Sequence, residues 1–176
     1  MKIIGLAGLA RVGKTTIAEY LRDNHGYTIL SFATPLKEAL VALTDLPMEY
    51  FTDQDLKHEP LSTFSGKSPR EVMQLFGTDF CRNMIAEDFW CNLMHNKILN
   101  TQSNVVIDDI RFQDEADLIT SLGGVVVNLH RKSVERDSDH VSENGVHATM
   151  DIAMGDGVFN AYNFFIDTMD DNGVTV

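Results

Sequence analysis

The sequence predicts an α/β fold in which a parallel sheet of about five strands lies between two layers of helices. Two observations lead to this prediction. Short apolar runs rich in valine and isoleucine, typical of strands buried on both faces, alternate with longer segments whose apolar residues recur at helical spacing. A glycine-containing turn joins the first strand directly to the first helix. Alternating strands and helices form a parallel sheet that is covered on both faces.

The turn after the first strand has a recognisable pattern. Residues 3–7 form the apolar strand, and apolar residues recur at helical spacing from Lys14 until Gly26 ends the helix. Between them, residues 8–15 read GLARVGKT, which satisfies the P-loop pattern G-x-x-x-x-G-K-[ST] in full. The predicted fold is therefore the three-layer sandwich of P-loop NTPases, with ligands at the carboxyl ends of the strands. A chance match in a glycine-containing turn is the alternative.

The residue types of this loop predict nucleotide binding. Gly8 and Gly13 let the backbone turn so that amide groups point at phosphate oxygens, and the N-terminus of the following helix favours an anion. Lys14 would reach the β- and γ-phosphates, and the Thr15 hydroxyl would bind Mg²⁺. ATP and Mg²⁺ are therefore the expected cofactors. For Arg11, a place in solvent is slightly favoured over contact with phosphate or base. The residues expected to bind the nucleotide are Gly8, Arg11, Val12, Gly13, Lys14, Thr15 and Thr16.

Length, composition and charge limit the class of protein. The 176 residues suit one domain, residues 1–176, with a proper core. No stretch approaches the roughly 20 apolar residues that span a bilayer, and the chain starts without a secretory segment, so we expect a cytoplasmic protein without a membrane partner. Cys81 and Cys91 are expected to be reduced thiols. A net charge of −12 opposes broad contact with a DNA or RNA backbone but permits a small anionic ligand.

The second strand is predicted at residues 27–32, which are rich in β-formers. A helix is predicted to begin at Thr34-Pro35, with proline at the first helical position. Residues 45–67 are polar and show no period, and they predict a mobile excursion over the nucleotide site. The buried face of the helix is predicted to carry Leu36, Leu40 and Leu43.

The central segment predicts two further helices. The sequence Ser68–Glu71 is a capping box with proline at the first helical position, and Gly77 is expected to interrupt or bend this helix before it resumes to residue 84. Residues 87–99 predict the next helix from their apolar spacing. Its Trp90 is more often a core anchor than a surface on which a base stacks, and both roles stay open.

Two acidic residues end the predicted third strand, residues 104–109. In a P-loop fold such a strand lies beside the first strand and brings a carboxylate near the metal. Asp109 is the first choice for this role, through a water molecule, with Asp108 close behind. Either carboxylate could instead cap the next short helix.

The last third of the chain predicts two more strands, at residues 125–129 and 162–166. Between them, residues 131–150 or so form a charged segment with little periodicity, which we interpret as a lid. Arg131 and Arg136 lie in this segment.

Six segments, in order along nearly the whole chain, resemble the phage deoxynucleoside monophosphate kinases. The resemblance implies the fold of nucleoside monophosphate kinases and transfer of the γ-phosphoryl group of ATP to the phosphate of a deoxynucleotide. Two departures bear on base specificity, because the tail after residue 166 lacks the family's Asn-Asp-Gly turn and terminal helix, and because the chain is compact. The matching segments are the P-loop, Ser31–Lys37, Lys57–Leu61, Ser68–Asp79 with Arg82, Asp109–Phe112 with Glu115-Ala116, and His140–Glu143.

This reaction brings several negative charges together, so the site needs cations. We assign Arg70, Arg82 and Arg111 to the acceptor phosphate, and Arg131 or Arg136 to the migrating phosphoryl group. Each could instead be a solvated charge or part of a surface ion pair. The expected catalytic residues are Lys14, Asp108, Asp109, Arg111 and Arg131. The expected substrate-binding residues are Lys37, Arg70, Arg82, Trp90, Arg111, His140 and Glu143. The expected metal site consists of Thr15 and Asp109.

Other functions stay open at this stage. Similar P-loop kinases phosphorylate the hydroxymethyl group of 5-hydroxymethyluracil in phage DNA, and that acceptor needs a base, which Asp108 beside Asp109 could supply. DNA would then be a partner. A dephospho-coenzyme A kinase is a further alternative with a poorer fit between residues 68 and 82. A GTP-dependent switch would need an Asn-Lys-x-Asp element, which residues 96–99 lack. A homodimer is also open.

Overall fold

The computed structural model of the chain describes residues 1–131 and 145–154. The chain divides into two compact units. The first unit contains residues 1–31 and the residues from 95 onward, and the second contains residues 32–94. The expectation that residues 1–176 form a single kinase domain with an excursion and a lid stays a prediction.

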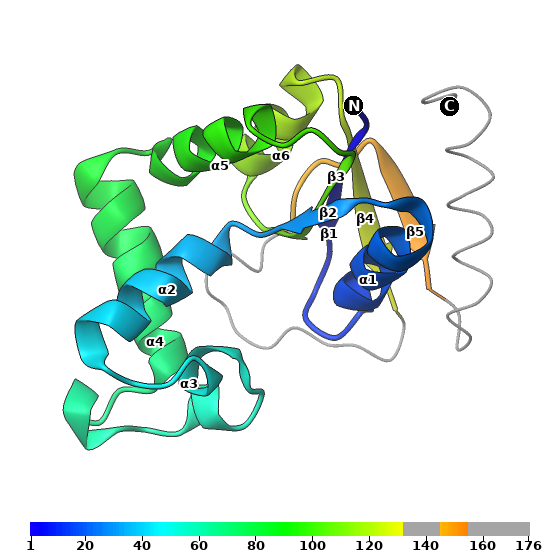
Figure 1. Cartoon of the computed structure of the whole chain (residues 1–176). Helices are drawn as coiled ribbons and strands as arrows, with labels where there is room; N and C mark the ends of the chain where they lie inside the picture. Colours follow the sequence, from blue (N-terminus) through cyan, green and yellow to red (C-terminus); the bar gives the residue numbers. More distant parts are fainter. Residues whose placement is uncertain (132–144, 155–176) are drawn as a thin grey trace. The chain divides into compact units, whose positions relative to one another are not determined.

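The first unit is built on a parallel sheet, as predicted. Its strands stand in the order β2-β3-β1-β4-β5, and every pair of neighbours is parallel (Figure 1). The first strand of the chain thus lies in the centre, between β3 and β4, where both faces are covered and its five residues are buried. The strands are β1 (Ile3–Ala7), β2 (Thr28–Leu30), β3 (Val105–Ile110), β4 (Val125–His130) and β5 (Met150–Ala153).

The fifth strand of this sheet was not predicted. β5 falls at the end of the segment interpreted as a lid, and it pairs with β4 from Val127 opposite Met150 to His130 opposite Ala153. The strand predicted at residues 162–166 lies outside the described residues. With only four residues and one buried side chain, β5 carries too weak an alternation to be recognised in the sequence.

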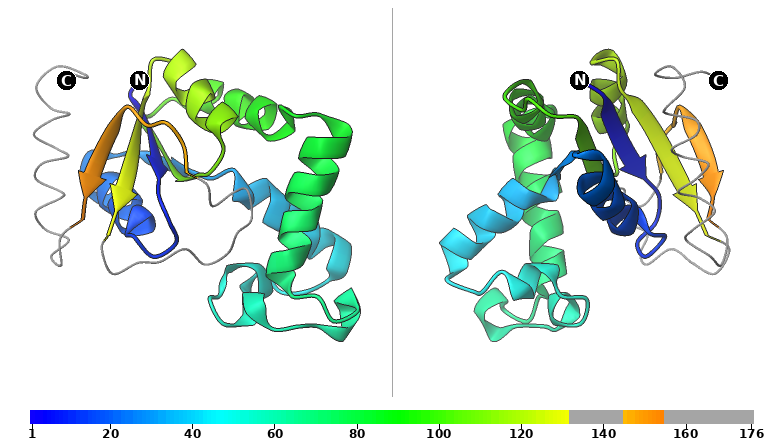
Figure 2. Two further views of the ribbon diagram at one scale, coloured as in Figure 1. Left: turned by 180° about the vertical axis from the view of Figure 1, so that it is seen from behind. Right: turned by 45° about the vertical axis from the view of Figure 1, so that its right-hand side comes forward.

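Helices α1 (Lys14–His25) and α6 (Gln113–Ser121) cover opposite faces of the sheet (Figure 2). Successive residues of β1 alternate between these faces, as the pleat of a strand requires. Ile4 and Leu6 belong to the core on the α1 side. Gly5 faces the other side, where a Cβ at this position would lie 3.5 Å from Ile119 of α6. The predicted three-layer sandwich is therefore confirmed.

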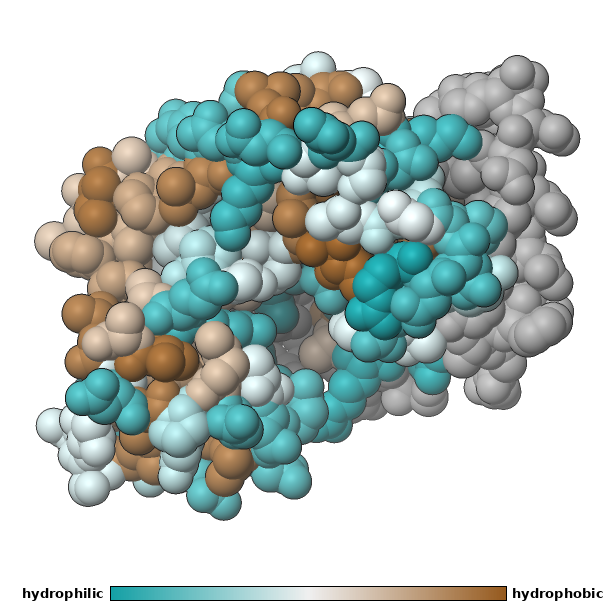
Figure 3. Space-filling view, viewed as in Figure 1, coloured by the Kyte–Doolittle hydropathy of each residue, from teal (hydrophilic) through white to brown (hydrophobic). Residues whose placement is uncertain are grey.

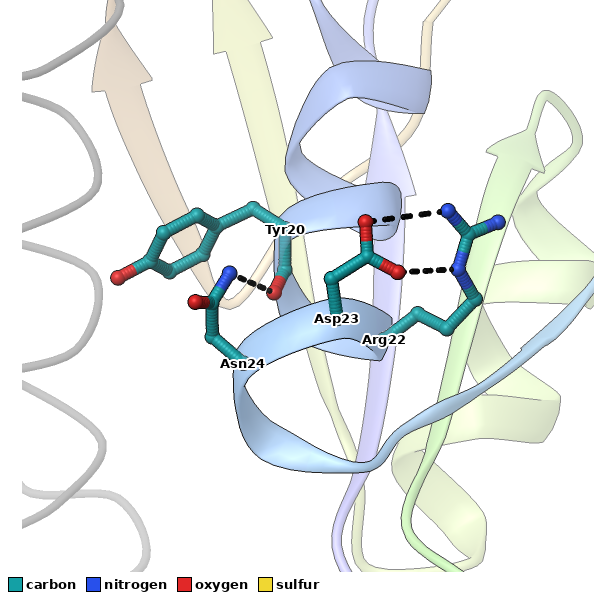
Figure 4. A network of polar contacts seen from close by, with 4 residues as sticks. All are labelled: Tyr20, Arg22, Asp23 and Asn24. Atoms are coloured by element: carbon teal, nitrogen blue, oxygen red, sulfur yellow. Dashed lines mark hydrogen bonds and ion pairs between the residues drawn. The ribbon is translucent and has the colours of Figure 1, made fainter.

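The end of α1 has the geometry that its sequence predicted. Gly26 adopts a left-handed conformation with φ 68°, its N–H donates to the Arg22 carbonyl, and the next N–H donates to the Leu21 carbonyl. These two bonds form a Schellman motif, which satisfies the last carbonyls of the helix. At the same end, Arg22 and Asp23 form an exposed ion pair (Figure 4), which contributes little to stability because both side chains face solvent.

The second unit is helical. The excursion predicted as irregular contains three short helical segments, and Phe51 within the first of them is buried. Helix α5 (Phe89–Leu99) runs across the boundary between the two units. The other helices of the second unit are α2 (Ala33–Thr44), α3 (Glu49–Thr52), η1 (Leu56–His58), η2 (Ser62–Phe64), α4 (Pro69–Gln74) and η3 (Leu75–Ile85).

Two predictions for helix α2 need correction, and the predicted capping box of α4 is confirmed. Helix α2 begins at Ala33, so Pro35 is its third residue and not its first. Leu43 is 69% exposed and does not belong to the buried face, whereas Leu40 does. The capping box of α4 is present, with the Ser68 N–H donating to Glu71 Oε2 at 2.8 Å and the Glu71 N–H donating to Ser68 Oγ at 3.3 Å.

The helix is not interrupted at Gly77 but changes from α to π geometry at Leu75 and continues to Ile85. Gly77 packs closely against α2, because a Cβ at this position would lie 3.0 Å from Leu36 Cδ2. The indole N–H of Trp90 donates to the Gly77 carbonyl at 2.8 Å, and Trp90 is 8% exposed. Trp90 is thus a core anchor, the role that the sequence favoured.

Apolar side chains remain exposed on the described surface (Figure 3). Many of them come from the π-helix η3 of the second unit. Its wider turn separates residues that an α-helix would bring onto one face. The exposed apolar residues of η3 are Leu75, Phe80, Met84 and Ile85.

The turn after β1 packs directly against the backbone of β4. Gly8 has φ 122°, and a Cβ at this position would collide with the carbonyl oxygen of Leu129. Only glycine combines this φ with room for the neighbouring strand. The position of the whole turn therefore depends on the missing side chain at Gly8.

We predict that Gly8→Ala lowers the free energy of unfolding by more than about 3 kcal/mol, because backbone strain and a collision with backbone atoms add together. Gly26→Ala is the matched control. It also has positive φ, but nothing lies within 4 Å of its Cβ position, so it should cost only about 1–2 kcal/mol. Thermal and urea unfolding of both variants measure the difference, and equal losses would contradict the packing described at Gly8.

Candidate active site

The P-loop joins β1 to α1 and presents its backbone at the carboxyl edge of the sheet. Gly13 stands before the first residue of α1 with φ 108°, and Arg11 also has a positive φ of 66°. The Arg11 side chain is exposed, which agrees with the place in solvent that the sequence slightly favoured. Val12 is buried in the core, so only its backbone is free to face a ligand.

The Lys14 ammonium lies over the loop. Its Nζ donates to the carbonyl oxygens of Gly8 and Leu9, each at 2.7 Å. The cation is therefore held across the concave side of the turn, at the N-terminal end of α1, where the helix dipole also favours an anion. Contact of this lysine with a phosphate group, the role of the lysine in the P-loop pattern, stays a prediction.

Both aspartates of β3 lie in an irregular pairing between β1 and β3. Gly5 pairs with Ile107 and Ala7 pairs with Ile110, so three steps along β3 correspond to two along β1. Ile110 lies against Gly5, with Cγ1 3.1 Å from the Cβ position of that glycine, on the α6 side of the sheet. Ile107, which pairs with Gly5, lies on the same side as that glycine. Because Ile107 and Ile110 both face α6, the extra residue between them directs Asp108 and Asp109 to the other side of the sheet.

The two carboxylates contact different partners on that side. Thr15 Oγ1, in the first turn of α1, donates to Asp108 Oδ2 at 3.3 Å. Ser31 Oγ, just after β2, donates to Asp109 Oδ2 at 2.7 Å. The carboxylate beside the P-loop hydroxyl is therefore Asp108, whereas the sequence placed Asp109 first.

Glu115 is a contributor to this region that sequence reasoning did not assign to the site. It is 3% exposed, and its Oε2 accepts the backbone N–H groups of Arg111 at 2.8 Å and Phe112 at 3.1 Å. These are the residues that connect β3 to α6. A glutamate at the third position of a helix whose N-cap has no polar side chain was the signal that could have revealed it.

Arg131 reaches the P-loop from the end of β4. Its Nη2 lies 3.8 Å from the Cβ position of Gly13, and Met154 after β5 lies 3.4 Å from the same point. The Nε atom of Arg131 is buried and has no hydrogen-bond partner among the described residues. The structure thus brings Arg131 to the loop, and its contact with phosphate stays a prediction.

The edge formed by β4 and β5 carries a polar cluster next to Arg131. His130 Nε2 and Asn128 Nδ2 lie 2.9 and 3.0 Å from Asp151 Oδ1. The hydrogen bond from His130, followed by that from Asn128, lowers the pKa of the Asp151 carboxyl below its ordinary value. This cluster joins the two strands at the point where Arg131 leaves the sheet, and no pattern in the sequence indicated it.

The remaining candidates divide into two groups. Four lie in the second unit, and their meeting with the P-loop stays a prediction: Lys37 in α2, Arg70 in α4, Arg82 in η3 and Trp90 in α5. Arg82 is the notable one, since it is 8% exposed and its Nη1 donates to the Glu87 carbonyl at 3.3 Å. The second group lies outside the described residues and consists of Arg136, His140 and Glu143.

Within residues 1–131 and 145–154, no helix is long and apolar enough to cross a membrane. Cys81 and Cys91 are both buried and form no disulfide.

Comparison with known proteins shows a likeness in fold and a likeness in sequence. The solved structure of TT1252 from Thermus thermophilus superposes with a TM-score of 0.53 at 14% identity, covering 99% of this chain and 98% of that one, which shows the fold alone. A protein of Acanthamoeba polyphaga mimivirus that carries the name of a deoxynucleotide monophosphate kinase is 37% identical over 161 residues, 81% of each chain. The deoxynucleoside-5′-monophosphate kinase of Escherichia phage T5 is 32% identical over 89 residues, 46% of this chain and 36% of the phage protein.

The profile of the family described as deoxynucleotide monophosphate kinase matches residues 44–161. This span is more than half of the chain, and it begins after the P-loop, so the loop pattern and the family match are separate observations. Together with the mimivirus relative, it shows that the chain belongs to the deoxynucleotide monophosphate kinase family.

Proposed function

We propose that the protein transfers the γ-phosphoryl group of ATP to the 5′-phosphate of a deoxynucleoside monophosphate. The observation that carries this proposal is the grouping of Lys14, Thr15 and Asp108 at the P-loop of a chain from this family. The names of the mimivirus and phage T5 relatives support the choice of acceptor.

The proposed reaction needs positioning and charge neutralisation more than proton transfer. The bond between the γ-phosphorus and the oxygen that bridges to the β-phosphate breaks, and a bond to an oxygen of the acceptor phosphate forms. The products are ADP and a deoxynucleoside diphosphate. Because the acceptor phosphate is already an anion, no base has to remove a proton from it.

The donor set beside the P-loop fits Mg²⁺. The Thr15 hydroxyl and the Asp108 carboxylate are hard oxygen donors that already contact each other, and Mg²⁺ in kinases is held by one or two protein groups together with water and substrate phosphates. We therefore assign the metal to Thr15 and Asp108. When bound, the ion would neutralise negative charge on the β- and γ-phosphates.

Arg131 is suited to the migrating phosphoryl group. A guanidinium beside Gly13 lies next to the backbone amides and the lysine that would hold the triphosphate, and its planar donors match phosphate oxygens. Its buried Nε atom is a donor for which a ligand oxygen would supply the partner.

Arg70, Arg82 and Arg111 are proposed to bind the acceptor phosphate. Burial supports Arg82 in particular, because a buried guanidinium keeps strong attraction for an anion, whereas an exposed one is screened by water and salt. Arg111 follows the carboxyl end of β3, two residues after Asp109.

The first prediction is that the purified protein, with ATP and Mg²⁺, converts at least one deoxynucleoside monophosphate to the diphosphate. A chromatographic assay over the four common deoxynucleotides measures this, and DNA that contains 5-hydroxymethyluracil is the competing acceptor. Lys14→Ala should abolish turnover while circular dichroism shows a folded protein, because the cation at the phosphates is lost. Phosphate incorporation into the DNA alone would overturn the proposed function.

The second prediction concerns Arg82. Arg82→Ala should raise the KM for the monophosphate by at least about tenfold, through loss of a charge-assisted contact, and leave the KM for ATP little changed. Arg82→Lys keeps the charge but not the planar donors, and it should restore only part of the loss. The matched control is Arg22→Ala, which removes an exposed arginine paired with Asp23. Equal increases in both KM values would remove Arg82 from the acceptor site.

The third prediction separates the two aspartates. Asp108→Asn should raise the Mg²⁺ concentration for half-maximal activity by about tenfold or more, because a charged group near the metal is lost. Asp109→Asn changes the same atoms one residue away, where the partner is Ser31, and should shift the Mg²⁺ requirement much less. Titration of activity with Mg²⁺ at saturating ATP gives both values, and a larger shift for Asp109→Asn would reverse the assignment.

A further inference from the structure

We propose that Glu115 is a positioning residue that fixes the backbone of Arg111 and thereby directs its guanidinium at the acceptor phosphate. This inference rests on the proposed function, and it gives a role to a residue with no place in the chemistry. Its starting point is the pair of hydrogen bonds from Arg111 N–H and Phe112 N–H to the single oxygen Oε2 of Glu115.

The two hydrogen bonds to Glu115 hold the peptide groups before and after Arg111. The Arg111 N–H belongs to the peptide group before the Arg111 Cα, and the Phe112 N–H belongs to the peptide group after it. Since one oxygen atom accepts both, at 2.8 and 3.1 Å, rotation of either group would break a bond. The φ and ψ angles of Arg111, and with them the direction of its Cα–Cβ bond, are therefore restrained together.

A helix cap alone does not explain this arrangement. In a capping box the glutamate at the third helical position accepts only the N–H of the N-cap residue, which here is Phe112. Arg111 precedes the N-cap and lies outside α6, so its bond satisfies no N–H group of the helix. The capping box of α4 provides the comparison, because Glu71 there bonds only to Ser68, the N-cap residue itself.

Burial makes the restraint strong. Glu115 is 3% exposed, whereas Glu71 is exposed. Hydrogen bonds to a charged acceptor are stronger when water is excluded, and a buried carboxylate is costly unless such donors satisfy it. Removing the carboxylate would leave two consecutive backbone N–H groups without this acceptor, at the turn that carries Arg111.

The test measures the KM for the acceptor and the KM for ATP in a set of Glu115 variants. Glu115→Ala should raise the KM for the deoxynucleoside monophosphate by about tenfold or more, with the KM for ATP little changed, because it removes hydrogen bonds and allows the arginine to move. Glu115→Asp shortens the side chain by one methylene and should behave in the same way. Glu115→Gln keeps an oxygen at the same reach, which is able to accept both N–H groups, and should remain close to wild type.

Two controls separate positioning from a general loss of stability. Asp117→Ala removes an exposed carboxylate one turn into the same helix and should change neither KM. In a double-mutant cycle, Glu115→Ala added to Arg111→Ala should cause no further rise in the acceptor KM, because Glu115 acts through Arg111. Melting temperatures for all variants report the stability effect separately.

The possible results are distinct. Three results would each overturn the inference while wild-type turnover preserves the proposed function. They are an unchanged acceptor KM in folded Glu115→Ala or Glu115→Asp, additive effects in the double-mutant cycle, and a Glu115→Gln variant whose acceptor KM is as high as that of Glu115→Ala. A wild-type protein that phosphorylates no deoxynucleotide would instead overturn the proposed function.

Discussion

The close approach of the P-loop to β4 is the constraint on which the site depends. At Gly8 the chain passes so near the Leu129 carbonyl that no side chain fits. This contact seats the loop between the ends of β1 and β4, and it brings the residues that follow β4 and β5, Arg131 and Met154, to the other glycine of the loop, Gly13. One missing side chain therefore permits both the phosphate-binding turn and the arginine beside it.

The irregular pairing of β3 with β1 determines how the acidic residues are used. In a regular strand, two successive carboxylates would point to opposite faces, and one of them would enter the core beneath α6. The extra residue in β3 places both carboxylates on the side of the P-loop, where each binds a different hydroxyl group. Asp108 contacts Thr15 and Asp109 contacts Ser31, so two identical side chains have different hydrogen-bond partners. The fold obtains this difference from backbone geometry alone.

The arginines show that burial changes how strongly a charged group attracts phosphate. The protein is acidic overall, yet Arg82 and Arg131 have little or partial contact with solvent, and such guanidinium groups attract phosphate more strongly than exposed ones. Glu115 illustrates the same principle for an acceptor, since its burial turns an ordinary capping carboxylate into a restraint on Arg111. Net charge opposes broad contact with a nucleic-acid backbone but permits a small anionic ligand, because a few arginines suffice to bind it.

The sequence alone determined the alternation of strands and helices, the P-loop with Lys14 and Thr15, and the capping box at Ser68, because each of these depends on residues close together in the chain. It could not determine the order of the aspartates, the edge strand β5 or the π geometry of η3. Those features depend on register between distant strands and on packing against Leu36 and Trp90. Pairing register and close packing arise only when separate segments meet, and a local pattern carries no record of them.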